Sequence, residues 1–189
     1  MRIVGGQLRG RPLVAPGDAA IRPTSDRVRE AIFNILAHGI AGYSLDGARV
    51  LDLFAGTGAL GLEALSRGAA FCLFVEESAD ARALIRRNIE ALGLTGVSKI
   101  FRRDATGLGP AGKHGGARVV FLDPPYGRGL AERALASAAD GGWLAPGAVA
   151  VLEERKGEPV ALPPGFQAID RRTWGDTQAL FARFGSAAH

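Results

Sequence analysis

Apolar and polar positions follow two alternating periods through the centre of the chain, from residue 49 onward. Five short runs are almost continuously apolar, as expected of parallel strands buried on both faces: residues 49–54, 71–76, 98–103, 118–123 and 148–153. Three segments with apolar residues at helical spacing lie between them: residues 59–67, 78–92 and 130–139. This alternation of strand and helix predicts an α/β fold with a doubly wound, mostly parallel sheet.

The carboxyl-terminal part of the chain breaks this alternation. Residues 167–174 and 177–184 are both strand-like, and only Gly175-Asp176 separates them. Two strands around so short a turn predict an antiparallel hairpin. We expect this hairpin to close the parallel sheet at one side.

The beginning of the chain predicts a separate extension. Residues 1–24 are rich in glycine, proline and arginine, and two short β-like pieces at 2–4 and 12–15 predict a small hairpin arm. Residues 25–37 carry an apolar stripe at helical spacing and begin with polar capping residues, which predicts a helix. The expected organisation is an arm over residues 1–24 and one domain over residues 25–189.

Charge and composition narrow the class of protein. The net charge is +4, and the first 30 residues hold six arginines against three acidic residues, which suits a polyanionic partner. The single cysteine, Cys72, excludes an internal disulfide and favours an intracellular, cytoplasmic location. No run of about 18 apolar residues and no metal-ligand spacing occurs, so we expect neither a membrane span nor a metal site.

The first strand of the domain ends in a glycine-rich sequence. Residues 52–61 read Asp-Leu-Phe-Ala-Gly-Thr-Gly-Ala-Leu-Gly, which is the G-x-G-x-x-G pattern between a strand and a helix. Such glycines let a ligand approach the backbone, and the helix N-terminus favours negative groups. The pattern alone is shared with nucleotide oxidoreductases. The residues expected to contact a cofactor here are Asp52, Phe54, Ala55, Gly56, Thr57, Gly58 and Gly61.

Acidic residues stand at the ends of three successive predicted strands. Glu76 follows Gly56 by 20 residues, where a carboxylate can accept both hydroxyls of a ribose. Asp104, next to Ala105, could accept a hydrogen bond from an adenine amine. Asp52 could meet a cofactor ammonium group, directly or through water. Because ligands bind at the carboxyl edge of such sheets, these acids favour a nucleoside cofactor that carries an ammonium group over NAD.

The fourth predicted strand runs directly into Asp123-Pro124-Pro125-Tyr126. Consecutive prolines hold the backbone extended and leave carbonyl acceptors without N–H donors. A flat base can stack on the adjoining ring, which contributes about 1–3 kcal/mol per base. An exocyclic amine is a poor nucleophile because its lone pair is delocalised, so acceptors on its hydrogens can aim that lone pair at a methyl donor. The tetrapeptide therefore predicts chemistry on an amino group of a planar ring.

Together, the glycine loop and the Asp-Pro-Pro-Tyr tetrapeptide resemble the class I S-adenosylmethionine-dependent amino-methyltransferases. The resemblance implies their Rossmann-like fold, with S-adenosylmethionine as the cofactor. It implies that Asp123 and the Pro124 carbonyl hold the target amine while Tyr126 stacks on the base. It also implies that Glu76 binds the ribose and Asp104 the adenine.

The arm adds a narrower resemblance. Residues 1–6, 9–11, 22–34 and 61–69 closely resemble a bacterial family that methylates guanine N2 in small-subunit (16S) ribosomal RNA, although a tyrosine is expected where Trp174 stands. The resemblance implies 16S rRNA within an assembling small ribosomal subunit as the substrate, and we expect a monomer. The residues expected to contact RNA are Arg2, Arg9, Arg11, Arg22, Thr24 and Arg27; residues 22–24 could instead fold over the cofactor as a lid.

Three other functions stay open at this point. The same tetrapeptide serves DNA adenine-N6 methylation, although this chain has little room for a target-recognition domain. The glycine loop alone would fit a dinucleotide oxidoreductase. A non-catalytic RNA-binding protein could also use the same fold.

Several remaining residues are expected to be structural. Glu153, Glu154, Arg155 and Lys156 are expected to form a solvated strand end, and Cys72 is expected in the core. Residues 106–116 are glycine-rich and predict a mobile loop, whereas Arg102 and Arg103 suit either a plain surface or phosphate contacts.

Overall fold

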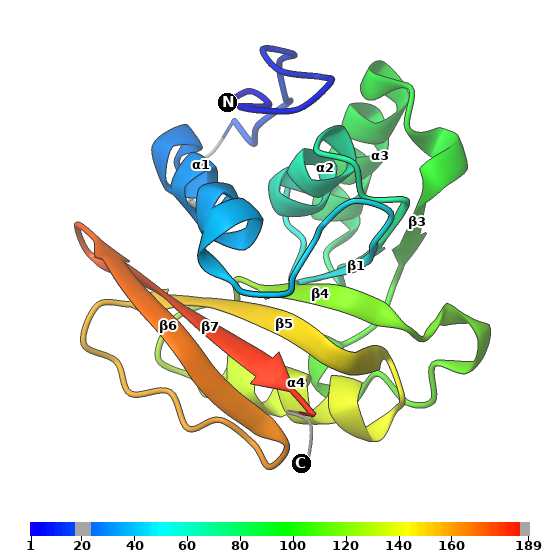
Figure 1. Cartoon of the computed structure of the whole chain (residues 1–189). Helices are drawn as coiled ribbons and strands as arrows, with labels where there is room; N and C mark the ends of the chain where they lie inside the picture. The colour runs from blue at the N-terminus through cyan, green and yellow to red at the C-terminus, as the bar shows by residue number, and fades with distance from the viewer. Residues whose placement is uncertain (18–23, 186–189) are drawn as a thin grey trace.

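The computed structural model describes residues 1–17 and 24–185, and these residues form a mixed sheet of seven strands (Figure 1). The strand order is β3-β2-β1-β4-β5-β7-β6; β1 to β5 are parallel, and β7 and β6 are antiparallel to their neighbours. The predicted parallel sheet with a closing hairpin is confirmed. The strands are β1 (Arg49–Leu53), β2 (Phe71–Val75), β3 (Ser98–Phe101), β4 (Ala117–Leu122), β5 (Leu144–Arg155), β6 (Phe166–Trp174) and β7 (Thr177–Phe184).

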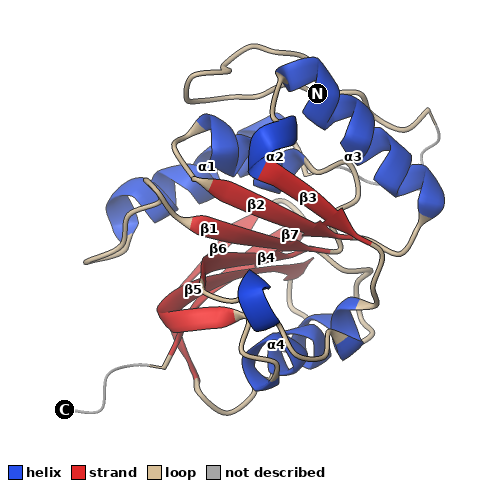
Figure 2. Ribbon diagram, turned by 90° about the vertical axis from the view of Figure 1, so that its right-hand side faces the viewer, coloured by secondary structure: helices blue, strands red, loops and turns tan. Residues whose placement is uncertain are grey.

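Helices cover both faces of this sheet. Strand alternation separates the two cores: Phe121 of β4 packs on the side of the first three helices, and its neighbour Val120 packs toward the fourth. Figures 1 and 2 show the resulting three layers, with α1 (Asp26–Asn34), α2 (Ala59–Ser66) and α3 (Ala79–Leu92) on one face and α4 (Leu130–Asp140) on the other.

The strand register brings several candidate site residues to one edge of the sheet. Leu53 of β1 pairs with Val75 of β2 and with Leu122 of β4. Leu122 also pairs with Leu152 of β5. The residues that follow these four positions therefore leave the sheet at the same carboxyl edge. They are Phe54, Glu76, Asp123 and Glu153.

The N-terminal extension differs from the expectation in two details. Ser25 caps α1 as predicted, because its Oγ accepts a backbone N–H of the first turn at 3.2 Å, but the α-helix ends at Asn34 and continues as a π-helical turn at Ile35–Gly39. The arm doubles back on itself as expected. However, within its described residues the antiparallel pairing is a single bridge between Arg2 and Pro12, since several N–H groups of the arm donate to α2 instead.

Strand β5 is longer than the apolar pattern predicts. It spans Leu144–Arg155 rather than residues 148–153, and β7 pairs with it as far as its last residue. Glu153 is 3% exposed and Glu154 is 8% exposed, so the expectation of a solvated strand end is wrong for these two residues, whereas Arg155 and Lys156 are exposed as expected. The reason is that pairing with β7 covers a part of β5 that an open sheet edge would leave in water.

The glycine-rich segment 106–116 is packed rather than loose. Leu108 is buried, and its N–H donates to Oγ of Ser137 in α4 at 2.7 Å. The indole N–H of Trp143 donates to the Gly109 carbonyl at 2.8 Å. The expectation of a mobile loop is therefore not met, because the apolar residues of the segment are buried against α4.

Candidate active site

The backbone turns sharply after β1, at the predicted glycine loop. Phe54 has a φ of 58°, and it is the only non-glycine residue with a positive φ in the described part of the chain. Gly56 and Gly58 follow with φ values of 59° and 80°. A Cβ on Gly56 would have its nearest neighbour 4.0 Å away, at the Phe54 carbonyl oxygen. The backbone of the turn is thus accessible to a ligand, and backbone strain of this kind clusters at ligand sites.

Gly61 and Asp52 hold α2 against the sheet. A Cβ on Gly61 would lie 2.5 Å from the Phe74 ring and 2.6 Å from Sγ of Cys72, so only glycine permits this approach. The Gly61 N–H donates to Oδ2 of Asp52 at 3.0 Å. Asp52 is buried, and burial raises its pKa well above the usual range. The structure places both residues in the packing behind the glycine turn.

The Glu76 carboxylate closes the other side of the glycine turn. Its Oε2 accepts a hydrogen bond from the Gly56 N–H at 2.8 Å, and its Oε1 accepts one from the Ser78 N–H at 3.0 Å. These two bonds fix the orientation of the carboxylate. Each carboxylate oxygen can accept a second hydrogen bond, so the group retains capacity for a pair of hydroxyls.

Asp104 lies beyond the end of β3 and is exposed. Its Oδ1 accepts hydrogen bonds from the hydroxyl of Thr106 at 2.7 Å and from the Thr106 N–H at 2.8 Å, and these bonds lower the pKa of Asp104. Ala105 is buried beneath this turn. Asp104 therefore caps a turn through one oxygen, which leaves Oδ2 as the atom that could meet an adenine amine.

Strand β4 delivers the tetrapeptide to the same edge. Pro124 is buried and Pro125 is exposed, whereas Asp123 and Tyr126 are half-buried. The guanidinium carbon of Arg155 lies 6.0 Å from the centre of the Tyr126 ring, at the limit of a cation–π contact. The corner thus presents one carboxylate and one aromatic ring close to the protein surface.

Thr24 and Glu153 meet Asp123 beneath the tetrapeptide. Oγ1 of Thr24 lies 3.4 Å from Oδ2 of Asp123, and 3.0 and 3.1 Å from the two carboxylate oxygens of Glu153. Burial raises the pKa of Asp123 to about 6, partly offset by the Thr24 hydrogen bond. Burial and the neighbouring Asp123 charge raise the pKa of Glu153 well above its usual range.

The sequence pattern predicted that Glu153 is exposed to solvent, but the structure places this residue in the tetrapeptide corner. Strands β4 and β5 pair at Leu122 and Leu152, so Asp123 and Glu153 are neighbours one position further on. Strand alternation sends both side chains to the face covered by α1. The only signal in the sequence was an acid directly after an apolar run. Its neighbour depends on strand register, which a single sequence does not specify.

A second cluster of buried charge joins the arm and α1 to α2. Glu63 of α2 accepts hydrogen bonds from the N–H groups of residues 4 and 5 at 3.0 and 2.8 Å. It also pairs with Arg29 of α1 at 3.4 Å and with Arg67 at 2.8 Å, and the side chains of Glu63 and Arg29 are fully buried. Arg29 donates further to the Thr24 carbonyl at 3.4 Å, which links this cluster to the tetrapeptide corner.

The arginines expected to contact RNA have different surroundings. Arg2, Arg9 and Arg27 are exposed. Arg11 is also exposed, but its guanidinium donates to a carbonyl near the C-terminal end of α3 at 2.6 Å, which fastens the arm to that helix. Arg22 lies outside the described residues. The exposed arginines stay predicted contacts, and two of them have structural partners in addition: Arg11 has this carbonyl, and Arg2 has the Asp26 carboxylate at 3.9 Å.

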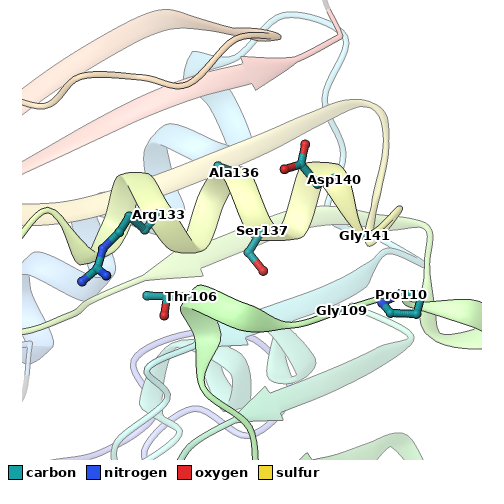
Figure 3. Close-up of a pocket in the computed structure, with 8 residues that line it drawn as sticks. All are labelled: Thr106, Gly109, Pro110, Arg133, Ala136, Ser137, Asp140 and Gly141. Atoms are coloured by element: carbon teal, nitrogen blue, oxygen red, sulfur yellow. The ribbon is translucent and has the colours of Figure 1, made fainter.

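A cavity of about 610 Å³ lies between α4 and the segment that follows Asp104 (Figure 3). In Figure 3, Arg133 and Thr106 lie at one end of this cavity, and Pro110 and Gly141 lie at the other. Only the Thr106 end adjoins the turn that Asp104 caps. The rest follows α4 toward its C-terminal end, so we place the candidate active site at the carboxyl edge of the sheet and not in this cavity.

Other classes of site find no support in the described residues. No group of three or more histidine, cysteine, aspartate and glutamate side chains among them could hold a metal ion. No helix within residues 1–17 and 24–185 is both long and apolar enough to cross a membrane. Cys72 is fully buried in the core of the α1–α3 side, as predicted.

The strand order and the glycine turn after β1 define the class I fold of the S-adenosylmethionine-dependent methyltransferases. The family model described as conserved hypothetical protein 95 matches residues 1–183. The chain is 42% identical over 153 residues to "Ribosomal RNA small subunit methyltransferase D" of Escherichia coli (strain K12), covering 81% of this chain and 74% of the relative. The chain belongs to this family, that of ribosomal RNA small subunit methyltransferase D.

Solved structures agree with this membership. The structure of the "putative methyltransferase yhhF" from Escherichia coli superposes with a TM-score of 0.81 at 34% identity and covers 97% of both chains. An RNA methyltransferase from Salinibacter ruber, solved in complex with S-adenosyl-L-homocysteine, superposes with a TM-score of 0.65, covering 89% of this chain and 97% of that one. At 16% identity, this second similarity concerns the fold alone.

Proposed function

We propose that this chain transfers a methyl group from S-adenosylmethionine to the exocyclic N2 of a guanine in 16S ribosomal RNA, within an assembling small ribosomal subunit. The observation that carries the proposal is the placement of Asp123–Tyr126 at the carboxyl edge, one strand from the glycine turn. The name of the Escherichia coli relative supports ribosomal RNA as the substrate, and the resemblance of arm and tetrapeptide supports guanine N2. We further propose that the enzyme acts as a monomer in the cytoplasm.

The glycine turn and Glu76 are the residues that would hold the cofactor. The open space over Gly56 lets a ligand lie against the backbone, and the oriented Glu76 carboxylate can accept the hydroxyls of a ribose. Oδ2 of Asp104 would accept a hydrogen bond from the adenine amine. When bound, S-adenosylmethionine supplies an electrophilic methyl group. What this chain must then do is orient the acceptor nitrogen.

Asp123 and the Pro124 carbonyl would orient that nitrogen. Hydrogen bonds from the amine to these two acceptors hold its lone pair toward the methyl donor, and positioning is a large part of the barrier in a two-substrate transfer. With its pKa raised to about 6, Asp123 is mostly ionised at neutral pH and can accept a hydrogen bond. The ring of Tyr126 would stack on the base and set its plane.

The exposed arginines of the arm and α1 would position the RNA. Arg2, Arg9 and Arg27 present guanidinium groups to solvent, and such groups bind phosphate in a bidentate manner. Phosphate contacts fix the register of a nucleic acid, whereas the pocket selects the base. This division assigns affinity to the arm and specificity to the tetrapeptide corner.

The decisive experiment compares Asp123→Asn with the wild-type enzyme. The substrates are small-subunit particles from a strain without the corresponding methylation, bare 16S rRNA and duplex DNA, each incubated with tritiated S-adenosylmethionine. We expect Asp123→Asn to lose about 10²–10⁴-fold in kcat on the particles, because an amide oxygen is a weaker acceptor than a carboxylate. Its affinity for S-adenosylhomocysteine, measured by calorimetry, should stay within a few-fold.

Asp176→Asn is the matched control, because Asp176 is exposed in the β6–β7 turn, and it should keep full activity. Nuclease digestion and mass spectrometry of the product identify the methylated base. Label at N2 of guanine in the particles supports the proposal, whereas label at adenine N6 in duplex DNA overturns it. Full activity of Asp123→Asn would remove Asp123 from the catalytic role.

A further inference from the structure

Two carboxyl groups and one hydroxyl from three distant parts of the chain meet under the tetrapeptide. Thr24 comes from the residues before α1, Asp123 follows β4, and Glu153 lies near the end of β5. The hydroxyl oxygen of Thr24 is 3.0 and 3.1 Å from the Glu153 oxygens and 3.4 Å from Oδ2 of Asp123. Glu153 is only 3% exposed, so its carboxyl group requires a hydrogen-bond partner within the fold.

Counting donors restricts how protons are placed in this group. A threonine hydroxyl carries one hydrogen and can donate to only one of the two carboxyl groups. If both carboxyl groups were ionised, one of them would face the Thr24 oxygen with no hydrogen between them. With one further proton on Glu153, the chain of bonds is complete: Glu153 donates to Thr24, and Thr24 donates to Asp123.

We propose that Glu153 and Thr24 are positioning residues for Asp123: the protonated Glu153 carboxyl donates a hydrogen bond to the Thr24 hydroxyl, which donates to Oδ2 of Asp123, so that the negative charge is held on the carboxylate facing the substrate amine. This inference rests on the proposed role of Asp123 as the acceptor for that amine. It adds a reason why the amino end of α1 is tied to the carboxyl ends of β4 and β5.

The charged groups around Thr24, Asp123 and Glu153 favour a protonated Glu153 beside an ionised Asp123. Burial, the Asp123 charge and the Asp52 charge disfavour a negative charge on Glu153, whereas the Thr24 hydroxyl and Arg29 of α1 favour it. The balance raises the pKa of Glu153 well above its usual range. Burial raises the pKa of Asp123, the Thr24 hydrogen bond lowers it and the Glu154 charge raises it, with a net value of about 6. Glu153 is only 3% exposed whereas Asp123 is half-buried, so desolvation penalises a charge on Glu153 more strongly and the shared proton is placed there.

The experiment uses two pairs of variants that differ in their hydrogen-bonding capacity. Glu153→Gln keeps a donor toward Thr24 but cannot ionise, whereas Glu153→Leu keeps neither property. Thr24→Ser keeps the hydroxyl, and Thr24→Val removes it at nearly the same volume. Each full-length variant is assayed for kcat, KM and the pH dependence of kcat/KM with ribosomal particles, and calorimetry with S-adenosylhomocysteine reports an intact cofactor site.

We expect Glu153→Gln and Thr24→Ser to keep kcat within about 5-fold, and Glu153→Leu and Thr24→Val to lose about 10–100-fold in kcat with little change in KM, since a misplaced acceptor loses its orientation. The acid limb of kcat/KM should fall near pH 6 in the wild type, at the pKa of Asp123. Thr24→Val should move that limb to higher pH, because it removes the bond that lowers this pKa. Glu153→Gln should leave the limb in place.

Two results would overturn the inference. One is a Glu153→Gln enzyme as slow as Glu153→Leu, because the reaction would then need a charged Glu153. The other is a Thr24→Val enzyme whose acid limb does not move. Because Glu153→Gln, Thr24→Ser and Thr24→Val change little volume, the test stands even if Glu153→Leu does not fold. Full activity of Asp123→Asn would refute the proposed role of Asp123 and this inference with it, whereas an inactive Asp123→Asn enzyme beside unaffected Thr24 and Glu153 variants refutes only this inference.

Discussion

Two buried glutamates of this protein lie in opposite electrostatic surroundings. Glu63 of α2 is fully buried, contacts the guanidinium groups of Arg29 and Arg67, and accepts two backbone N–H groups of the arm. Glu153 of β5 is buried to a similar degree, but its nearest polar partner is a single hydroxyl, and the charge of Asp123 repels it. Glu63 is thus surrounded by cationic groups and hydrogen-bond donors, whereas Glu153 shares one hydroxyl donor with a second acid.

Glu63 is therefore an acid that stabilises the fold, whereas Glu153 has the surroundings of an acid that serves a reaction. A compensated carboxylate such as Glu63 joins three segments and has no capacity left for a ligand. Two adjoining buried acids such as Asp123 and Glu153 destabilise the folded state when both are ionised, and proteins retain such pairs where chemistry requires a shifted pKa. The two clusters are linked through Arg29, which contacts Glu63 and the Thr24 carbonyl.

The largest expected effect is on the compensated cluster. Glu63→Ala leaves the buried Arg29 with Asp26 as its one carboxylate partner, at 2.9 Å, and leaves two arm N–H groups without their acceptor. We expect it to lower the free energy of unfolding by about 3–5 kcal/mol. Urea unfolding followed by circular dichroism measures this change. Glu90→Ala is the control, because Glu90 is exposed on α3 and should change the stability by less than about 0.5 kcal/mol. A loss of under about 1 kcal/mol in Glu63→Ala would mean that the ion pair contributes little to the fold.

An intermediate effect distinguishes two glycines of the loop between β1 and α2. Gly61→Ala puts a methyl group within 2.6 Å of Phe74 and Cys72, so we expect about 1–3 kcal/mol of destabilisation from overpacking. Gly56→Ala meets no such contact, but its positive φ and its position over the proposed cofactor site should weaken S-adenosylhomocysteine binding more strongly than Gly61→Ala does. Calorimetry and urea unfolding on both variants test the division. Equal losses of cofactor affinity would contradict it.

The smallest expected effect concerns the uncompensated acid and depends on pH. Because the pKa of Glu153 is raised, the folded protein keeps a proton that the unfolded chain releases above its ordinary pKa of 4.5, so this group makes the wild type less stable as the pH rises through that value. Glu153→Gln removes this term. We expect it to be more stable than the wild type at pH 7.5, with the difference vanishing near pH 4. Urea unfolding at both pH values checks this prediction, and a gain independent of pH would contradict it.

Much of the fold was readable from local patterns. Apolar runs of strand length, the helical spacing between them and the Gly175-Asp176 turn each depend on neighbours in sequence, and the structure confirms all three. The glycine loop and the tetrapeptide could be placed at strand ends for the same reason. The errors concern segments whose state depends on distant partners: residues 106–116 are packed against α4, and Glu153 is covered by pairing with β7.

What the sequence determined by itself is the set of elements and the identity of the groups that follow each strand, because periodicity and turn chemistry are local properties. What only the tertiary structure decided is which of these groups meet. The register between β4 and β5 puts Glu153 beside Asp123, and the packing of α1 brings Thr24 between them. A strand specifies its own alternation, but its neighbour and its register come from long-range packing, and burial and proton placement follow from those contacts.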